Sequence, residues 1–375
     1  MLPYGRQDIE QADVDAVVAA LQSDWLTTGP EVERFEAAIS KVAGGASATV
    51  VTSGTAALHT AYAAANLAPG DEVVSTPMTF VATQSTACAF GAKIVFADID
   101  PFTGNLDPEA AAAAVTDKTK VIATVDYAGH PVKGPEFQKL AAESGALFLE
   151  DAAHSIGSTL NGVPVGQLAD LTTFSFFPTK NLTTAEGGAV ITTSAELDKR
   201  ARNFKGLGMI RDPKEMRAQD EGSWFYEVQE FGLNYRLPDV LCALGTSQIA
   251  RLGQYKTRRQ EIHDRYNAAF AGNESLTLPG VEQGAEPMWH LYPLRVPAER
   301  RRAIFDELRT RGIGVQVNYI PSYWHPVFQD MGYKKGMCPN AEQFYAQEIS
   351  LPLFATLTND QVDMVIENVL EIVGE

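Results

Sequence analysis

Short apolar runs alternate with helical segments through the first half of the chain, and few folds accommodate this alternation. The runs are continuous, not alternating with polar residues, which is typical of parallel strands buried on both faces. They fall at 48–52, 73–74, 94–96, 121–123 and 147–149. We therefore predict an α/β fold with a mainly parallel sheet between helices, and we expect functional residues at the carboxyl ends of its strands.

The remainder of the chain predicts a second, smaller unit. Residues 206–230 are polar and poorly periodic, which indicates an excursion from the core. The other expected helices are 9–21, 30–42, 54–65, 195–204, 238–270, 303–311 and 361–373, and the other expected strands are 188–193, 289–296 and 314–319. We predict a large cofactor-binding domain over 1–250 and a small C-terminal domain over 251–375.

Composition excludes several classes of partner. The 375 residues carry a formal net charge of -17, which disfavours nucleic acid and anionic membranes. There is no signal core and no apolar run of about 20 residues that could span a bilayer. Three distant cysteines without ligand spacing predict neither a metal site nor disulfides. We expect a cytoplasmic protein that binds no metal, no nucleic acid and no membrane.

One lysine lies in unusual surroundings. Lys180 is placed in the apolar, hydroxyl-rich and glycine-ended segment 174–188. Loss of hydration favours the neutral amine, which suits Schiff-base chemistry with a carbonyl cofactor. The alternative is a strand end with a lysine whose charged head reaches solvent.

Two further segments carry groups that complement this lysine. Ser53–Ala56 joins a strand to a helix, and the N–H groups of such a junction attract phosphate. A helix cap without a ligand explains the same residues. Asp151 ends another buried strand, where a protonated ring nitrogen would be a suitable partner, and His154 follows three residues later. The alternative here is a helix cap with a buried histidine behind it.

Together the three segments match the functional groups of pyridoxal 5'-phosphate: a phosphate, a ring nitrogen and an aldehyde. Two other classes remain open. A non-catalytic regulator could retain the same fold, and the strand and helix alternation also occurs in dinucleotide-dependent oxidoreductases. The missing GxGxxG motif weakens the second alternative.

The chain resembles the DegT/DnrJ/EryC1/StrS family of nucleotide-sugar aminotransferases. The motifs that carry the resemblance are 4–7, 26–30, 53–58, 150–154, 175–180, 186–188 and 232–236. It implies an aspartate-aminotransferase-like fold of type I with a large domain and a small α/β domain. It also implies pyridoxal phosphate, an amino-acid donor, expected to be L-glutamate leaving as 2-oxoglutarate, and a nucleotide-linked keto sugar as acceptor.

The resemblance also assigns roles to residues. Lys180 would bind the cofactor and transfer the proton, Asp151 would hold the ring nitrogen, and His154 would lie beside the phenolic oxygen. The phosphate would be held by Gly54, Thr55, Ala56 and Ser175, while Phe80 would stack on the ring. Asn234 would reach the phosphate from the neighbouring subunit of a homodimer. A core phenylalanine and a polar turn residue are the alternatives for Phe80 and Asn234. Lysine at position 180 also argues against the dehydratase branch of the family, which has histidine there.

Substrate choice is predicted from the same resemblance. It is strongest to the branch that aminates C4 of UDP-linked 4-keto-6-deoxy-N-acetylhexosamines for pseudaminic acid, although that branch often has histidine where Phe177 and Asn318 stand. A 3-keto sugar or a GDP- or dTDP-linked sugar is the alternative. The candidate substrate residues are Tyr4, Arg6, Thr28, Tyr319, Tyr323 and His325, with Arg6, Arg211 or Arg236 for the diphosphate. Tyr319, Tyr323 and His325 could equally be packing residues.

Overall fold

The structure is a computed structural model that describes residues 1–218 and 222–374. Its strands are β1 (Ser47–Val51), β2 (Glu72–Ser75), β3 (Lys93–Phe96), β4 (Thr119–Val125), β5 (Leu147–Asp151), β6 (Thr159–Leu160), β7 (Val163–Pro164), β8 (Leu171–Ser175), β9 (Gly188–Thr192), β10 (Met209–Ile210), β11 (Glu227–Val228), β12 (Ala285–Glu286), β13 (Tyr292–Arg295) and β14 (Glu348–Leu351).

The helices are α1 (Gln11–Leu21), α2 (Pro30–Val42), α3 (Gly54–Ala64), α4 (Ala82–Ala89), α5 (Pro108–Ala114), α6 (Gly134–Ser144), α7 (Ala195–Lys205), α8 (Asp239–Ile249), α9 (Leu252–Phe270), α10 (Arg301–Thr310), α11 (Pro326–Asp330), α12 (Pro339–Gln347) and α13 (Asn359–Gly374), with short 3-10 turns η1 (Tyr127–Gly129) and η2 (Ser322–Trp324).

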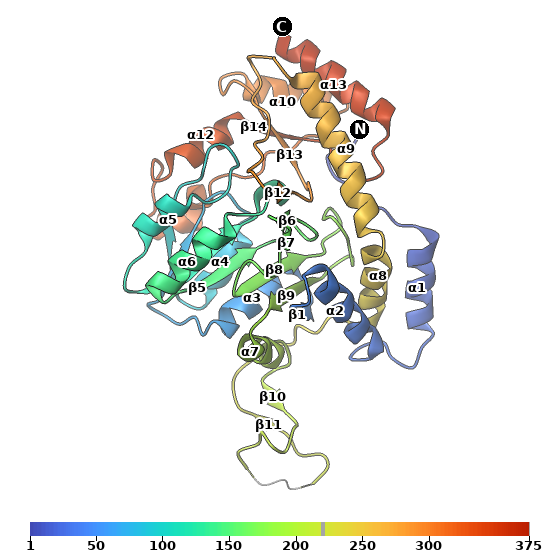
Figure 1. Ribbon diagram of the computed structural model, residues 1–375, viewed down its shortest axis with the longest axis vertical. Coiled ribbons are helices and arrows are strands. Elements are labelled where there is room, and N and C mark those ends of the chain that lie inside the picture. Colours follow the sequence, from blue (N-terminus) through green and yellow to red (C-terminus); the bar gives the residue numbers. More distant parts are fainter. Residues whose placement is uncertain (219–221, 375) are drawn as a thin grey trace.

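A seven-stranded sheet forms the centre of the molecule, with helices around it (Figure 1). Its strand order is β1-β9-β8-β5-β4-β2-β3. β9 pairs antiparallel with both β1 and β8, and the pairings among β8, β5, β4, β2 and β3 are parallel. The predicted α/β architecture with a mainly parallel sheet is therefore confirmed.

Both faces of the sheet are buried, as the continuous apolar strands required. Along β4, Val121 and Ala123 belong to the core cluster that contains residues of α3, such as Ala57. Ile122, between them, packs in a different cluster with Phe137 of α6. Successive side chains of a strand point to opposite faces, so α3 and α6 cover opposite faces of the sheet.

The C-terminal half builds the upper part of the molecule in Figure 1, around the β13–β14 pair and α9, α10, α12 and α13. The helix predicted over 238–270 is two helices, because α8 ends at Ile249 and α9 begins at Leu252. Leu2 forms a bridge with Ile313, so the N-terminus lies against this part. A domain boundary at residue 250 stays a prediction.

Two other predicted segments differ from expectation. The strand predicted over 314–319 is wrong: the segment has no strand of its own, and Gln316 makes an isolated bridge to Ser350. The excursion predicted over 206–230 leaves the body of the molecule as the β10–β11 hairpin, hereafter the arm (Figure 1). Positions 219–221 of this prediction lie outside the described residues.

In the part of the chain that the structure describes, none of the helices combines the length and the apolar character needed to cross a membrane.

Candidate active site

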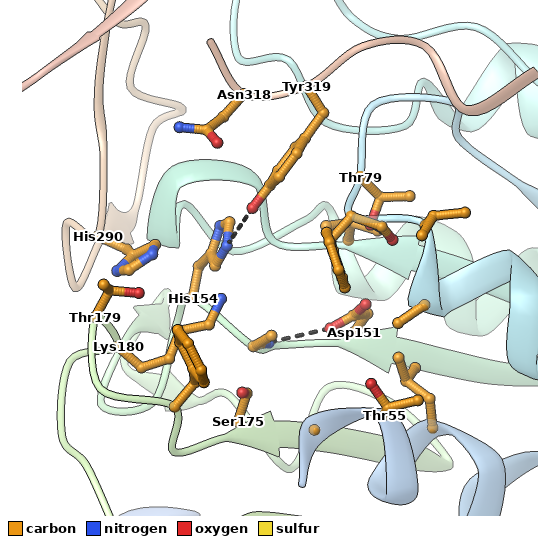
Figure 2. A pocket seen from close by; sticks show the side chains of 18 of the residues that line it. Thr55, Thr79, Asp151, His154, Ser175, Thr179, Lys180, His290, Asn318 and Tyr319 are labelled. Carbon is orange, nitrogen blue, oxygen red and sulfur yellow. Dashed lines mark hydrogen bonds between the residues drawn. The ribbon is translucent and has the colours of Figure 1, made fainter. Parts of the chain in front are cut away.

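A cavity of about 970 Å³ opens at the carboxyl ends of β5 and β8, between the sheet and the segment 316–320 (Figure 2). This size suits a small-molecule site. The cavity brings together ten of the residues predicted from sequence: Tyr4, Gly54, Thr55, Phe80, Asp151, His154, Ser175, Lys180, Tyr319 and His325. Most of them come from segments that are far apart in the chain, so the fold is what assembles the site.

Lys180 enters the cavity from the loop that follows β8. Its backbone N–H donates to the carbonyl of Phe177 at 2.9 Å, which fixes the turn that carries the side chain. Burial lowers the pKa of the Lys180 ammonium to about 8, and the nearby Asp151 carboxylate opposes this shift. The neutral amine, which nucleophilic chemistry requires, is therefore more populated near neutral pH than it is for an ordinary lysine.

Asp151 is the last residue of β5, and its carboxylate faces the cavity. Oδ2 accepts a hydrogen bond from the Thr83 hydroxyl at 2.6 Å, and Oδ1 accepts one from the N–H of Ala153 at 3.2 Å. Burial raises the pKa of Asp151, while these donors and the charge of Lys180 act in the opposite direction. A buried carboxylate gains from a cationic partner, and a protonated ring nitrogen would provide one.

The N-terminus of α3 and the end of β8 form an anion cradle. The N–H groups of Gly54 and Thr55 have no hydrogen-bond acceptor among the described residues. A Cβ on Gly54 would come within 2.7 Å of Cβ and 2.8 Å of Oγ of Ser175, so glycine keeps this space open. The role predicted for Ala56 is corrected, because its N–H caps the helix by donating to Ser53 Oγ at 3.0 Å.

His154 lies with His290 and Tyr319 across the cavity from the anion cradle, and the three rings are uncharged (Figure 2). Its Nε2 is hydrogen-bonded to the Tyr319 hydroxyl at 3.0 Å, and its ring lies 4.3 Å from that of His290 between centroids. Burial, together with the charge of Lys180, holds the pKa of both histidines well below the usual range. The Nδ1 atoms of both histidines are buried and have no partner among the described residues.

Several residues predicted from sequence lie elsewhere. Tyr323 as a substrate residue is wrong: it is buried against Phe96, and its hydroxyl donates to Glu342 at 2.8 Å. Arg6, Thr28 and Asn234 are exposed and do not line the cavity, and neither do Arg211 and Arg236. Asn234 lies at the base of the arm, where it bridges to Gly206.

The cavity also contains residues that the sequence reasoning missed. His290, Asn318 and Thr179 line it. Thr83 does not line it, but its hydroxyl donates a hydrogen bond to Asp151. His290 precedes β13 without any motif that marks it, so only the fold could reveal it. Asn318 was named from the sequence only as a position where the similar branch often has histidine, and not as a site residue.

The residues fit pyridoxal phosphate. Two helix N–H groups and the Ser175 hydroxyl can hold its phosphate, Asp151 can hold its ring nitrogen, and Lys180 can react with its aldehyde. The unpartnered Nδ1 of His154 supplies a further polar contact. Fold and site together define a fold-type I enzyme that depends on pyridoxal phosphate.

Comparison with known proteins identifies the group within this class. The chain belongs to the DegT/DnrJ/EryC1/StrS aminotransferase family, whose model matches residues 7–370. It is 38% identical to the spore coat polysaccharide biosynthesis protein SpsC of Bacillus subtilis, over 99% of this chain and 97% of that protein. It is 35% identical to a UDP-4-amino-4,6-dideoxy-N-acetyl-beta-L-altrosamine transaminase of Campylobacter jejuni, over 94% of this chain and 92% of that enzyme.

A solved structure with a similar fold is also that of a sugar aminotransferase. The putative sugar aminotransferase Spr1654 of Streptococcus pneumoniae, in its PMP form, superimposes with a TM-score of 0.94 at 30% identity, covering 100% of this chain and 99% of that one. The protein is therefore a pyridoxal phosphate-dependent sugar aminotransferase.

Proposed function

We propose that the enzyme moves the amino group of L-glutamate to the C4 ketone of a nucleotide-linked 4-keto-6-deoxy sugar, a UDP-linked N-acetylhexosamine in particular. The observation that carries the proposal is the amine of Lys180, whose pKa is lowered to about 8, in the same cavity as Asp151 and the anion cradle. The name of the Campylobacter jejuni relative supports the choice of sugar.

In the proposed reaction, different residues of the cavity bind the cofactor and transfer the proton. When bound, pyridoxal phosphate supplies an electron sink that makes a C–H bond of the bound amine acidic. Lys180, as a neutral amine, would take that proton and return it to the cofactor carbon that carried the aldehyde. Asp151 keeps the proton on the ring nitrogen, and Gly54, Thr55 and Ser175 anchor the phosphate.

We also propose that the active unit is a homodimer in the cytoplasm. Large apolar side chains are exposed on the arm and at the residue that follows it, where Trp224 is 74% and Phe231 is 98% exposed. Apolar groups exposed in this way mark contact surfaces, and a second copy of the chain is the partner proposed. Three free cysteines are compatible with a reducing compartment.

Incubation with amino acids and keto sugars tests the reaction. The purified enzyme is mixed with L-glutamate and a panel of UDP-, dTDP- and GDP-linked 4-keto-6-deoxy sugars and 3-keto sugars, and 2-oxoglutarate is measured. We expect release of 2-oxoglutarate over many turnovers only when a UDP-linked 4-keto sugar is present. Lys180→Ala should abolish release and the visible absorbance of the bound cofactor, whereas Lys139→Ala, an exposed lysine of α6, should change neither.

Each other outcome decides a different part of the proposal. Release with a 3-keto, dTDP- or GDP-linked sugar in preference would replace the proposed acceptor. Release that requires another amino acid would replace the donor. Absence of amine transfer to any keto sugar would refute the reaction.

A further inference from the structure

The segment 316–320 faces Ser175 and Thr55 across the cavity, and its main chain is fixed at Asn318 (Figure 2). The N–H of Asn318 donates to Oε2 of Glu348 at 2.8 Å. Its carbonyl accepts a hydrogen bond from the Tyr127 hydroxyl at 2.5 Å. These contacts leave the side chain of Asn318 as the part that can face a substrate.

The side-chain amide is oriented by a chain of two hydrogen bonds. Nδ2 of Asn318 donates to Oγ of Ser350 at 2.9 Å, and Oγ of Ser350 donates to Oε1 of Glu348 at 2.5 Å. A hydroxyl has one proton, so a serine that donates to a carboxylate can only accept from the amide. With Glu348 ionised, the amide nitrogen must therefore face Ser350 and the amide oxygen must face away.

The amide oxygen is left free toward the cavity. Asn318 lines the cavity, and its Oδ1 has no hydrogen-bond partner among the described residues. Figure 2 shows this oxygen on the side where His154 and Tyr319 lie, with the nitrogen turned away. An unpaired acceptor open to the cavity favours a ligand that brings a donor to it.

We propose that Asn318 is a specificity-determining residue whose amide oxygen accepts a hydrogen bond from a ring hydroxyl on the sugar of the substrate, and that Glu348 sets this orientation through Ser350. The inference rests on the proposed amination of a nucleotide sugar. Glu348 is fully buried and does not line the cavity, so it acts as a positioning residue.

Neutralising Glu348 reverses the chain of hydrogen bonds. In Glu348→Gln, the side-chain oxygen still accepts from the N–H of Asn318, and the side-chain nitrogen lies opposite Ser350 and donates to it. The hydroxyl of Ser350 then donates to Oδ1 of Asn318, and the amide turns its nitrogen to the cavity. The variant should therefore lose the preference for a sugar that offers a donor.

Protonation of Glu348 has the same effect as this substitution. Burial raises its pKa to about 8, and the donors Ser350 and Asn318 and the charge of Arg301 act in the opposite direction. Tyr127 and Tyr319 also lie near it, and both have pKa values above the usual range. Arg295 lies opposite Glu348 in the β13–β14 pair. Preference for a donor-bearing sugar should therefore increase as the pH rises through about 8.

Calorimetry with matched ligands tests the proposal. The probes are a UDP-linked 6-deoxy hexose and its analogues in which one ring hydroxyl is replaced by fluorine, which accepts a hydrogen bond but does not donate one. We expect the cofactor-loaded enzyme to bind the hydroxyl form roughly five- to tenfold more tightly than one of the analogues at pH 9. The ratio should approach one in Asn318→Ala and fall toward one in Glu348→Gln, because a hydroxyl facing the amide nitrogen accepts a hydrogen bond and its donor gives no further advantage over fluorine.

A control and a second measurement keep the test decisive. Ser144→Ala removes a serine hydroxyl that bonds within α6, far from this chain of hydrogen bonds, and should retain the wild-type ratio. Thermal unfolding shows whether each variant is folded. An unchanged ratio in folded Asn318→Ala, or a Glu348→Gln ratio equal to that of the wild type, would overturn the inference.

The half-reaction with the amine donor separates this inference from the proposed function. Conversion of the bound cofactor by L-glutamate is followed by absorbance in each variant. If the wild type reacts with the donor and aminates a keto sugar but shows equal affinity for all analogues, the role of Asn318 fails alone. If it aminates no keto sugar, the proposed function fails.

Discussion

At the scale of single residues, Thr83 is predicted to keep Asp151 ionised. Its hydroxyl donates to Oδ2 at 2.6 Å and lowers the pKa of a carboxyl that burial raises. Thr83→Val should raise that pKa further, weaken the contact with the ring nitrogen and slow the donor half-reaction about five- to tenfold, the effect of one hydrogen bond. Single-turnover absorbance measures this rate.

Thr86→Val is the matched control. Thr86 lies on the same helix, α4, and its hydroxyl bonds to the carbonyl of Ala82 at 2.7 Å, away from Asp151. Its replacement should leave the rate of the half-reaction unchanged. Equal slowing in both variants would show that a general disturbance of α4, and not the bond to Asp151, is responsible.

The charge state of Lys180 predicts a pH dependence. The amine attacks the cofactor only when neutral, and its pKa is lowered from 10.5 to about 8. Covalent attachment of pyridoxal phosphate to the apoprotein should therefore accelerate as the pH rises through about 8 and then level off. Asp151→Asn should move the midpoint to lower pH, because the carboxylate raises the pKa of Lys180. Stopped-flow absorbance gives the profile, and a midpoint near 10.5 would contradict the prediction.

The sequence predicted some residues better than others, for a physical reason. Lys180, Asp151 and Ser175 could be placed together because strand ends in a parallel sheet share one edge. Tyr323 could not be excluded, because an aromatic side chain with a polar tip suits a core and a site equally well. His290 had no local signal, since its place in the cavity depends on contacts distant in the chain.

At the scale of elements, the start of α3 is predicted to depend on glycine. A Cβ at position 54 would lie 2.7 Å from Cβ of Ser175, in the space that the phosphate needs. Gly54→Ala should weaken the affinity of the apoprotein for pyridoxal phosphate by tenfold or more, the order of one lost charge-assisted hydrogen bond. Titration of the apoprotein, followed by absorbance, measures this.

Gly253→Ala controls for the change of residue type. Gly253 is near the start of α9, and a Cβ there meets nothing within 4 Å. Alanine should leave cofactor affinity unchanged and stabilise the helix by about 0.5–1 kcal/mol. Unchanged affinity in Gly54→Ala as well would show that Ser175 gives way and that the cradle tolerates a methyl group.

Element boundaries were predicted less well than element types. The segment 314–319 resembles a strand in sequence, yet its partners include the side chains of Glu348 and Tyr127 and a single bridge to Ser350. Tertiary contacts hold this segment in an irregular conformation, which periodicity cannot reveal. The result matters for function, because Asn318 and Tyr319 face the cavity from it.

At the scale of the whole molecule, the negative charge must be reconciled with anionic ligands. The chain has a formal net charge of -17, and none of the described residues that line the cavity is an arginine. The described cavity offers helix N–H groups, hydroxyls and the low-pKa histidines His154 and His290, along with Lys180. A second subunit can supply further donors, and Asn234 is the residue predicted to do so.

Complementation between two inactive variants tests the shared site. If Asn234 serves the neighbouring subunit, Lys180→Ala and Asn234→Asp remove different halves of each site. Co-refolded in equal amounts, half of the dimers are mixed, and each mixed dimer contains one intact site. Activity should therefore return to about a quarter of the wild-type value in a transamination assay, as expected for a two-fold symmetric dimer with composite sites. Activity no greater than the average of the two variants would place Asn234 outside the partner's site.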